Sequence, residues 1–202
     1  MTHSIIGVGA LGKALASQFV RFKIPVQITR YSDITALRFM AREMGPCVHA
    51  VSVPETLQSD LVFLAIPFDA VATVVGAASS WNGRVVVDCT NAIDLASFTP
   101  RALGEQTSSE LVESLVQGAR LVKAFNTLPA ATLAQPAAAA GGHRVLFVSG
   151  NVGSAKEEVA QLATAFGFAP IDLGNLSAGG RLQQFGGALT GHNFIRLNSA
   201  DR

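Results

Sequence analysis

The sequence is poor in charge, in cysteine and in long apolar runs, and each shortage excludes a class of protein. Only 14% of its 202 residues are charged and the formal net charge is +1, so there is no basic field to hold nucleic acid or an acidic membrane. The two cysteines, Cys47 and Cys89, are too few for a disulfide framework and form no C-x-x-C pair, so we expect reduced thiols. No run of about 18 apolar residues occurs, so no membrane span is expected.

The first residues, 1–4, also lack the basic and apolar segments of a signal peptide. Together with the reduced cysteines, this leads us to expect a cytoplasmic protein. The apolar fraction is 49%, which is enough to bury a large core and too high for a disordered chain. The length fits one large domain, or one domain with a short appendage.

Catalytic and metal-binding patterns are missing as well. The four histidines, His3, His49, His143 and His192, have no convergent partner by spacing for a catalytic triad, and no metal-ligand spacing is present. We therefore predict neither a catalytic acid or base nor a metal site.

What the sequence does contain is a regular alternation of short apolar runs and helical periodicity. Strands are predicted at residues 4–8, 26–29, 47–51, 61–66, 85–88, 121–125, 145–149 and 169–173. Helices are predicted at residues 11–22, 34–44, 69–78, 108–118, 154–166 and, despite several glycines, 176–198. Ser154 and Glu157 form a predicted capping box for the fifth helix. Residues 94–107 are predicted to be irregular, and residues 135–142 a loop or a frayed helical turn.

This alternation predicts an α/β fold, a doubly wound parallel sheet with right-handed crossovers. We divide it into a Rossmann domain over residues 1–143 and a small C-terminal α/β unit over residues 144–202.

The segment from Gly7 to Gly12 reads G-x-G-x-x-G, and it lies between a predicted strand and a predicted helix, as a dinucleotide-binding motif must. Gly7 permits the tight turn, Gly9 lets the backbone approach a pyrophosphate, and Gly12 allows close packing of helix on strand. The helix N-terminus at Ala10 and Leu11 presents amides and a partial positive charge to the phosphates. The alternative is a glycine-rich turn without a ligand.

The end of the second predicted strand favours NADP(H) over NAD(H). NAD-binding versions usually end this strand with an acid that binds the ribose 2′-hydroxyl, whereas here it ends in Thr29 and Arg30. Arg30 can form a forked pair with a 2′-phosphate, and the hydroxyls of Thr29 and Ser32 can donate to the same group. Asp33 could instead bind a ribose, although we interpret it as a helix cap, and Arg30 could be a solvated surface residue.

Two further strand ends belong to the same predicted edge of the sheet, where ligands of open α/β sheets bind. Ala65, Ile66 and Pro67 end one strand, and Thr90 and Asn91 follow the next. The polar pair could contact a cofactor or substrate, or could only stabilise a turn. A cofactor motif without a catalytic acid or base fits hydride transfer, which needs proximity and orientation of two bound rings.

The sequence resembles the F420-dependent NADP oxidoreductase family, and the reductase domain of the STEAP metalloreductases is similar. The resemblance extends over nearly the whole chain, and its most specific block is 123–130. It is carried by Gly7-x-Gly-x-x-Gly12, Thr29-Arg30, Leu64-Ala-Ile-Pro67, Asp88-x-Thr-Asn91, Lys123-Ala-Phe-Asn-Thr-x-Pro-Ala130, Val148-x-Gly150, Ala155-Lys156 and Pro170-Ile-Asp-Leu-Gly-Asn-Leu176.

The resemblance implies hydride exchange between NADPH and coenzyme F420 or a flavin such as FMN or FAD, in a homodimer. It places the 2′-phosphate on Thr29 and Arg30 and the nicotinamide beside Ile66 and Pro67. The acceptor ring would be bordered by side chains of one segment and backbone groups of another: Asn126, Thr127, Leu128 and Pro129, then Val148, Ser149 and Gly150. Members of the family often have acidic residues after the glycine that matches Gly150, whereas this chain has Asn151 there. This difference leaves the identity of the hydride acceptor open.

Two other functions remain possible from the residues alone. Related Rossmann reductases act on imines or small keto acids, but they usually add a long helical C-terminal domain, and only about 60 residues follow the predicted Rossmann domain here. The other function is a redox-sensing module that binds NADP(H) without turnover, which the missing acid or base fits equally well.

Overall fold

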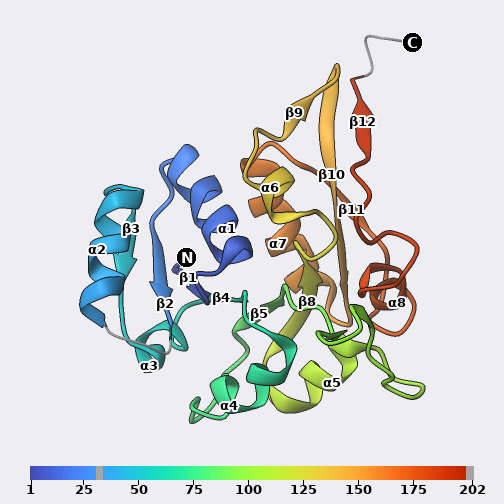
Figure 1. The fold of residues 1–202 in the computed structure, drawn as a ribbon, viewed down its shortest axis with the longest axis horizontal. Helices are drawn as coiled ribbons and strands as arrows, with labels where there is room; N and C mark the ends of the chain where they lie inside the picture. The colour runs from blue at the N-terminus through green and yellow to red at the C-terminus, as the bar shows by residue number, and fades with distance from the viewer. Residues whose placement is uncertain (31–33, 199–202) are drawn as a thin grey trace.

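A central sheet of mostly parallel strands organises the chain, and the computed structural model describes residues 1–30 and 34–198 (Figure 1). The strands run in the order β11-β10-β8-β5-β4-β1-β2-β3. Their bounds are β1 His3–Ile6, β2 Val26–Thr29, β3 Val48–Ala50, β4 Leu61–Leu64, β5 Val85–Asp88, β8 Arg120–Ala124, β10 Gly142–Gly150 and β11 Ala169–Asp172.

From β3 to β8 the strands are parallel, in the order of a Rossmann sheet. The register aligns Ile6 with Leu64, Leu64 with Asp88, and Asp88 with Lys123, so the carboxyl ends of four strands form one edge. The predicted α/β class and the doubly wound Rossmann sheet are confirmed.

The C-terminal strands continue this sheet in the opposite direction. β10 pairs antiparallel with β8, and β11 pairs parallel with β10. The predicted boundary after residue 143 therefore falls inside β10. The first residues of β10 extend beyond the sheet, where β9 (Ala138–Ala139) and β12 (Ile195–Leu197) pair with them in an arm near the C-terminus (Figure 1).

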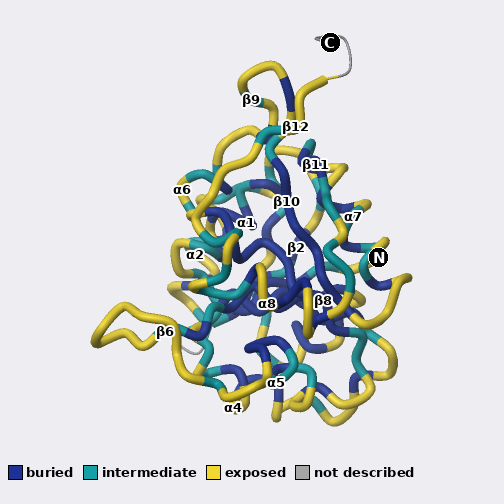
Figure 2. The backbone as a smooth tube through the Cα atoms, turned by 90° about the vertical axis from the view of Figure 1, so that its right-hand side faces the viewer, coloured by how far each residue is buried: buried dark blue, intermediate teal, exposed yellow. Residues whose placement is uncertain are grey.

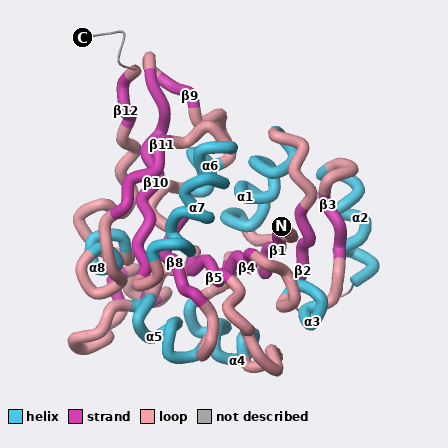
Figure 3. The backbone as a smooth tube through the Cα atoms, turned by 180° about the vertical axis from the view of Figure 1, so that it is seen from behind, coloured by secondary structure: helices cyan, strands magenta, loops and turns pink. Residues whose placement is uncertain are grey.

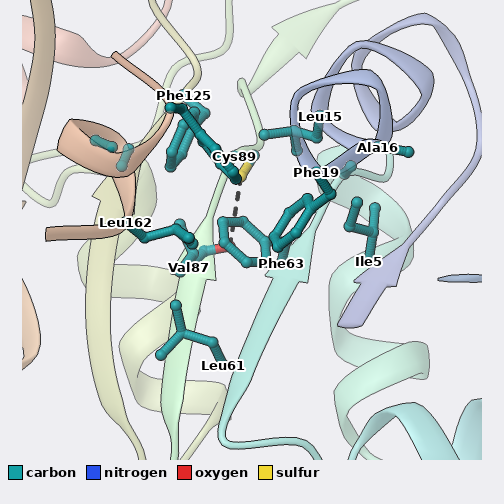
Figure 4. Packing of buried hydrophobic residues seen from close by; sticks show 14 of the residues in the cluster. Ile5, Leu15, Ala16, Phe19, Leu61, Phe63, Val87, Cys89, Phe125 and Leu162 are labelled. Atoms are coloured by element: carbon teal, nitrogen blue, oxygen red, sulfur yellow. Dashed lines mark hydrogen bonds between the residues drawn. The ribbon is translucent and has the colours of Figure 1, made fainter. Parts of the chain in front are cut away.

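Helices cover both faces of the sheet (Figures 1 and 3). One face carries α1 (Ala10–Arg21), α2 (Ile34–Met44), α6 (Ala130–Leu133) and α7 (Gly153–Ala165); the other carries α3 (Val53–Thr56), α4 (Val71–Val75) and α5 (Ser108–Leu115). In the core between the sheet and the first of these faces, Phe19 packs edge-to-face on Phe166. Phe19 also packs edge-to-face on Phe63, which in turn packs on Phe125 (Figure 4). Across the described ranges, every helix is too short or too polar to cross a membrane.

Several predicted elements were wrong in detail. The capping box at Ser154 is absent, because α7 begins one residue earlier, at Gly153, with no side-chain cap. A capping box does start α5, where Thr107 and Glu110 exchange hydrogen bonds. The predicted helix 69–78 is a 3₁₀ turn, η1 (Phe68–Ala70), followed by the short α4.

The largest difference lies in the tail. The predicted helix 176–198 is only α8 (Gly179–Gln183), because Gly186 and Gly191 have positive φ angles of 85° and 80° that break a helix. Residues predicted to be irregular contain a hairpin, β6 (Ile93–Asp94) and β7 (Thr99–Pro100), which projects as an exposed loop (Figure 2). Its turn is held by the Asp94 carboxylate, which accepts from the amides of Ala96 and Ser97.

Candidate functional site

The glycine-rich loop joins β1 to α1 at the carboxyl edge of the sheet. Gly7 has a φ angle of 104°, and its amide donates to the carbonyl of Thr29 at 2.8 Å. A Cβ atom at Gly7 would overlap the carbonyl of Ala65, and one at Gly12 would overlap the carbonyl of Gly7. Both positions therefore require glycine, which draws the helix tightly onto the strand end.

Gly9 differs, because a Cβ atom there would meet nothing within 4 Å. It is the N-cap of α1 and offers no side chain for the orphan amides of the first turn, which also carries no acidic residue. The helix N-terminus is thus open on the side of Gly9 and suited to an anion.

Arg30 follows β2 beside this loop. It is half-buried, and its Nε atom is buried with no hydrogen-bond partner among the residues that the structure describes. Buried donors are normally satisfied, so this nitrogen marks a place where an acceptor fits. Thr29, just before it, is buried at the end of β2, while Ser32 and Asp33 lie outside the described residues.

A cleft of about 320 Å³ opens along the same edge. Of the predicted site residues, Gly9, Ala10, Leu11, Ala65, Ile66, Pro67 and Asn91 line it. Thr90, predicted together with Asn91 as a polar pair, lines it as well. Sequence reasoning missed Phe68, Asp69, Cys89, Ile93 and Leu95. The first three closely follow strand ends and could have been found from that position, whereas the hairpin residues carried no signal.

A fully buried ion pair lies next to the cleft. Lys123 Nζ donates to Asp88 Oδ2 at 3.1 Å, and both side chains are inaccessible. Burial alone would raise the pKa of Asp88, but Lys123, together with donors from Ser109 and Thr90, holds that pKa below its ordinary value. The amide and hydroxyl of Thr90 donate to Asp88 Oδ1 at 2.9 and 2.6 Å, so this network fixes the turn that leads to Asn91.

The other titratable groups in the cleft are also committed to the fold. Asp69 makes a two-pronged ion pair with Arg101, whose guanidinium lowers the pKa of that carboxyl. Burial raises the pKa of the Cys89 thiol, which points among Leu15, Phe63 and Phe125 (Figure 4). In the described part of the cleft wall, these groups supply no free acid or base.

The residues predicted to border the acceptor lie behind the cleft. Asn126, Thr127 and Leu128 are buried, Pro129 is exposed, and the side chains of Leu128 and Val148 pack in the core. The residues around α8 cover this region: Thr127 accepts from the amide of Gly191, and Ser149 donates to Gln183. Gly150 pairs with Val122, before the end of β8, so it lies away from the carboxyl edge of the sheet. Its amide donates to the carbonyl of Gly174 at 2.9 Å. Only Asn126 reaches the cleft wall, through Asn91.

A Rossmann sheet, an open helix N-terminus behind a glycine turn and a buried arginine Nε without an acceptor among the described residues are together typical of dinucleotide-binding proteins. Residues 3–92 match the family described as "NADP oxidoreductase coenzyme F420-dependent". A protein from Arthrobacter sp. FB24 assigned as an F420-dependent NADP reductase is 26% identical, with a TM-score of 0.74, covering 88% of this chain and 86% of that one. The N-terminal part of the chain is thus similar to the F420-dependent NADP oxidoreductases, and the likeness to the Arthrobacter protein extends over most of the chain.

Two further relatives are similar to most of this chain. The rat metalloreductase STEAP3 is 27% identical over 178 residues, which are 86% of this chain and 34% of the relative. The chain thus spans about a third of the length of the curated relatives it matches. A crystal structure of a hypothetical protein from Sinorhizobium meliloti is 46% identical, with a TM-score of 0.93 and coverage of 97% and 96%.

Proposed function

We propose that the chain is an NADP(H)-dependent oxidoreductase that transfers a hydride between NADPH and coenzyme F420 or a flavin. The observation that carries the proposal is the buried, unpaired Nε of Arg30, at the end of a strand that lacks the usual acid. The match of residues 3–92 to an NADP oxidoreductase family supports the cofactor, and the family description supports F420 as the first acceptor to test.

In this proposal the chain's own residues bind and orient rather than react. The amides of Gly9, Ala10 and Leu11 bind the pyrophosphate, while Arg30 and Thr29 hold the 2′-phosphate. When bound, NADPH supplies the hydride. The cleft walls, which include the apolar Ile66, Pro67, Ile93 and Leu95, bound the nicotinamide and keep water from the reacting face.

The acceptor ring is proposed to enter from the open side of the cleft. Asn126 to Pro129 and Val148 to Gly150 then support the wall from behind, since residues 183–191 cover them. The hairpin offers Leu95 and Phe98, which are 78% and 69% exposed, as an apolar surface beside the entrance.

The test is a titration of the purified protein with NADPH and with NADH, each alone and then with F420, FMN or FAD, following binding and absorbance at 340 nm. Selective NADPH binding with oxidation only when one acceptor is present would establish the reductase and name its acceptor. If neither nucleotide binds, the proposal is wrong.

A second candidate is an NADP(H)-binding redox-sensing module without turnover. It is favoured by the commitment of Asp69 and Cys89 to structural contacts, which leaves the described cleft wall without a free acid or base. Tight NADPH binding with no oxidation by any acceptor would favour this function.

We also propose a homodimer that assembles through the C-terminal region. Leu182, Phe194 and Leu197 are apolar side chains exposed there, at 43%, 43% and 63%. Light scattering during size-exclusion chromatography should give twice the mass of 21.0 kDa, and the monomer mass would contradict the proposal.

A further inference from the structure

Gln183, in the short helix α8, is completely buried although its segment is glycine-rich and lies at the molecular surface. Its side-chain amide donates towards the carbonyls of Phe147 at 3.1 Å and Lys123 at 3.3 Å, and towards Asn126 Oδ1 at 3.4 Å. Its carbonyl oxygen accepts from the hydroxyl of Ser149. One side chain therefore joins α8 to β10, to β8 and to the loop after β8.

Asn126 connects Gln183 to the wall of the cleft. Its Nδ2 donates to the backbone carbonyl of Gln183 at 2.7 Å and to Asn91 Oδ1 at 3.0 Å. Asn91 Nδ2 donates in return to the backbone carbonyl of Asn126, also at 3.0 Å. The two asparagines thus form a reciprocal pair, and Asn126 has no amide hydrogen left for a ligand.

Asn91 is the member of this chain of contacts that lines the cleft. Its contacts with Asn126 use one of its two amide hydrogens and one lone pair of its oxygen. One donor and one acceptor remain on the half-buried side chain, fixed in orientation by the pair. A primary carboxamide presents the complementary acceptor and donor, and the nicotinamide ring carries such a group.

Contacts on either side of Gln183 hold the segment in place. The hydroxyl of Thr190 donates to the carbonyls of Gln183 at 3.2 Å and Gln184 at 2.7 Å. Phe185 packs on Phe98 of the hairpin, with ring centroids 5.4 Å apart. The segment is therefore anchored to both the sheet and the hairpin beside the cleft.

We propose that Gln183 is a positioning residue for the nicotinamide end of the cleft. Through Asn126 it fixes the Asn91 amide in the orientation that receives the nicotinamide carboxamide. Without the Gln183 side chain, the backbone carbonyl of Gln183 is no longer fixed to the sheet, so its bond to Asn126 and the pairing of Asn126 with Asn91 are weakened. The Asn91 amide can then rotate about its broad terminal torsion and exchange donor for acceptor. The inference rests on the proposed NADP(H) function and adds a role for the C-terminal segment in it.

The test compares three ligands by calorimetry or fluorescence: NADPH, its 3-acetylpyridine analogue, and 2′,5′-ADP. The analogue lacks the carboxamide nitrogen, and 2′,5′-ADP lacks the nicotinamide altogether. We expect the wild type to prefer NADPH over the analogue. Gln183→Met should lower this preference by about tenfold, the effect of one misplaced hydrogen bond, and leave 2′,5′-ADP affinity within about twofold.

Asn91→Ala should lose the same preference, and Gln183→Met combined with Asn91→Ala should lose no more, because both act through one contact. Gln161→Met, at an exposed position of α7, is the matched control and should behave as the wild type. If Gln183→Met does not fold, Ser149→Ala removes the hydroxyl contact to Gln183 without touching the cleft and should shift the preference in the same direction.

A wild type that binds 2′,5′-ADP but does not distinguish NADPH from the analogue would overturn the inference. So would a folded Gln183→Met variant with the wild-type preference. Failure of the wild type to bind 2′,5′-ADP would instead overturn the proposed function, and the inference with it.

Discussion

The three glycines of the loop have two different roles, because Gly7 and Gly12 are needed for packing and Gly9 is not. Gly12 packs against the carbonyl of Gly7, whereas Gly9 faces open space. Gly9→Ala should therefore fold with the wild-type melting temperature and lose NADPH affinity, because its methyl group occupies the approach of the pyrophosphate. Gly12→Ala, the matched control, should destabilise the fold by about 1–3 kcal/mol through overpacking. Thermal unfolding and NADPH titration of both variants check this; a Gly9→Ala variant with unchanged affinity would contradict it.

Arg30 tests the cofactor preference directly. Arg30→Ala should weaken NADPH by about 1.5–3 kcal/mol and leave NADH nearly unchanged, since only NADPH has the 2′-phosphate. Parallel titrations with the two nucleotides measure the difference. Arg42→Ala, at an exposed position of α2, is the charge-matched control. Equal weakening of both nucleotides by Arg30→Ala would remove the role given to this residue.

At the scale of single elements, a capping box starts α5 and not, as predicted, α7. Thr107 accepts from the amide of Glu110, and Glu110 accepts from that of Thr107. Thr107→Ala should lower the free energy of unfolding by about 1–2 kcal/mol. Ser154→Ala, where a cap was predicted but is absent, should change it by less than about 0.5 kcal/mol. Urea unfolding compares the two variants, and similar losses would contradict the role of Thr107 as the cap.

Elements with a clear hydrophobic pattern could be predicted from the sequence, and elements held by tertiary contacts could not. The buried runs of β4 and β5 are apolar at nearly every position, which fixed both strands and the edge where the cleft opens. α8 has no apolar repeat and is anchored by the hydrogen bonds of Gln183. The hairpin depends on the Asp94 turn and on the ion pair of Arg101. This is also why Asn91 could be predicted at the cleft, while the partners that hold it could not.

At the scale of the whole molecule, the C-terminal strands are expected to be indispensable for folding. β10 covers the edge of β8, and Phe166, at the end of α7, packs on Phe19 with ring centroids 4.9 Å apart. A fragment of residues 1–143 should therefore lack a cooperative thermal transition, whereas the full chain should have one. Calorimetry of both would decide. A sharp transition in the fragment would support the two-domain division predicted from the sequence.

The buried ion pair makes stability depend on acid. The pKa of Asp88 is below its ordinary value in the folded chain, so its contribution is complete above about pH 4, the unfolded pKa, and is lost as the pH falls through the folded pKa. Asp88→Asn should lower the free energy of unfolding by about 3–5 kcal/mol at pH 7, because Lys123 remains buried without its counter-charge. Urea unfolding at pH 7 and at pH 3 should show this difference shrinking in acid; a constant difference would contradict the linkage.

The reciprocal pair of Asn91 and Asn126 also sets an order of assembly. Asn126 comes 35 residues after Asn91, and Gln183 comes 57 residues after Asn126. A chain synthesised from its N-terminus completes every strand of the main sheet, through Asp172, before Gln183 is made. Under the proposed function, the phosphate-binding end of the cleft can therefore form before the last support of Asn91, so a nascent chain can hold the adenosine half of a dinucleotide before it orients the other half.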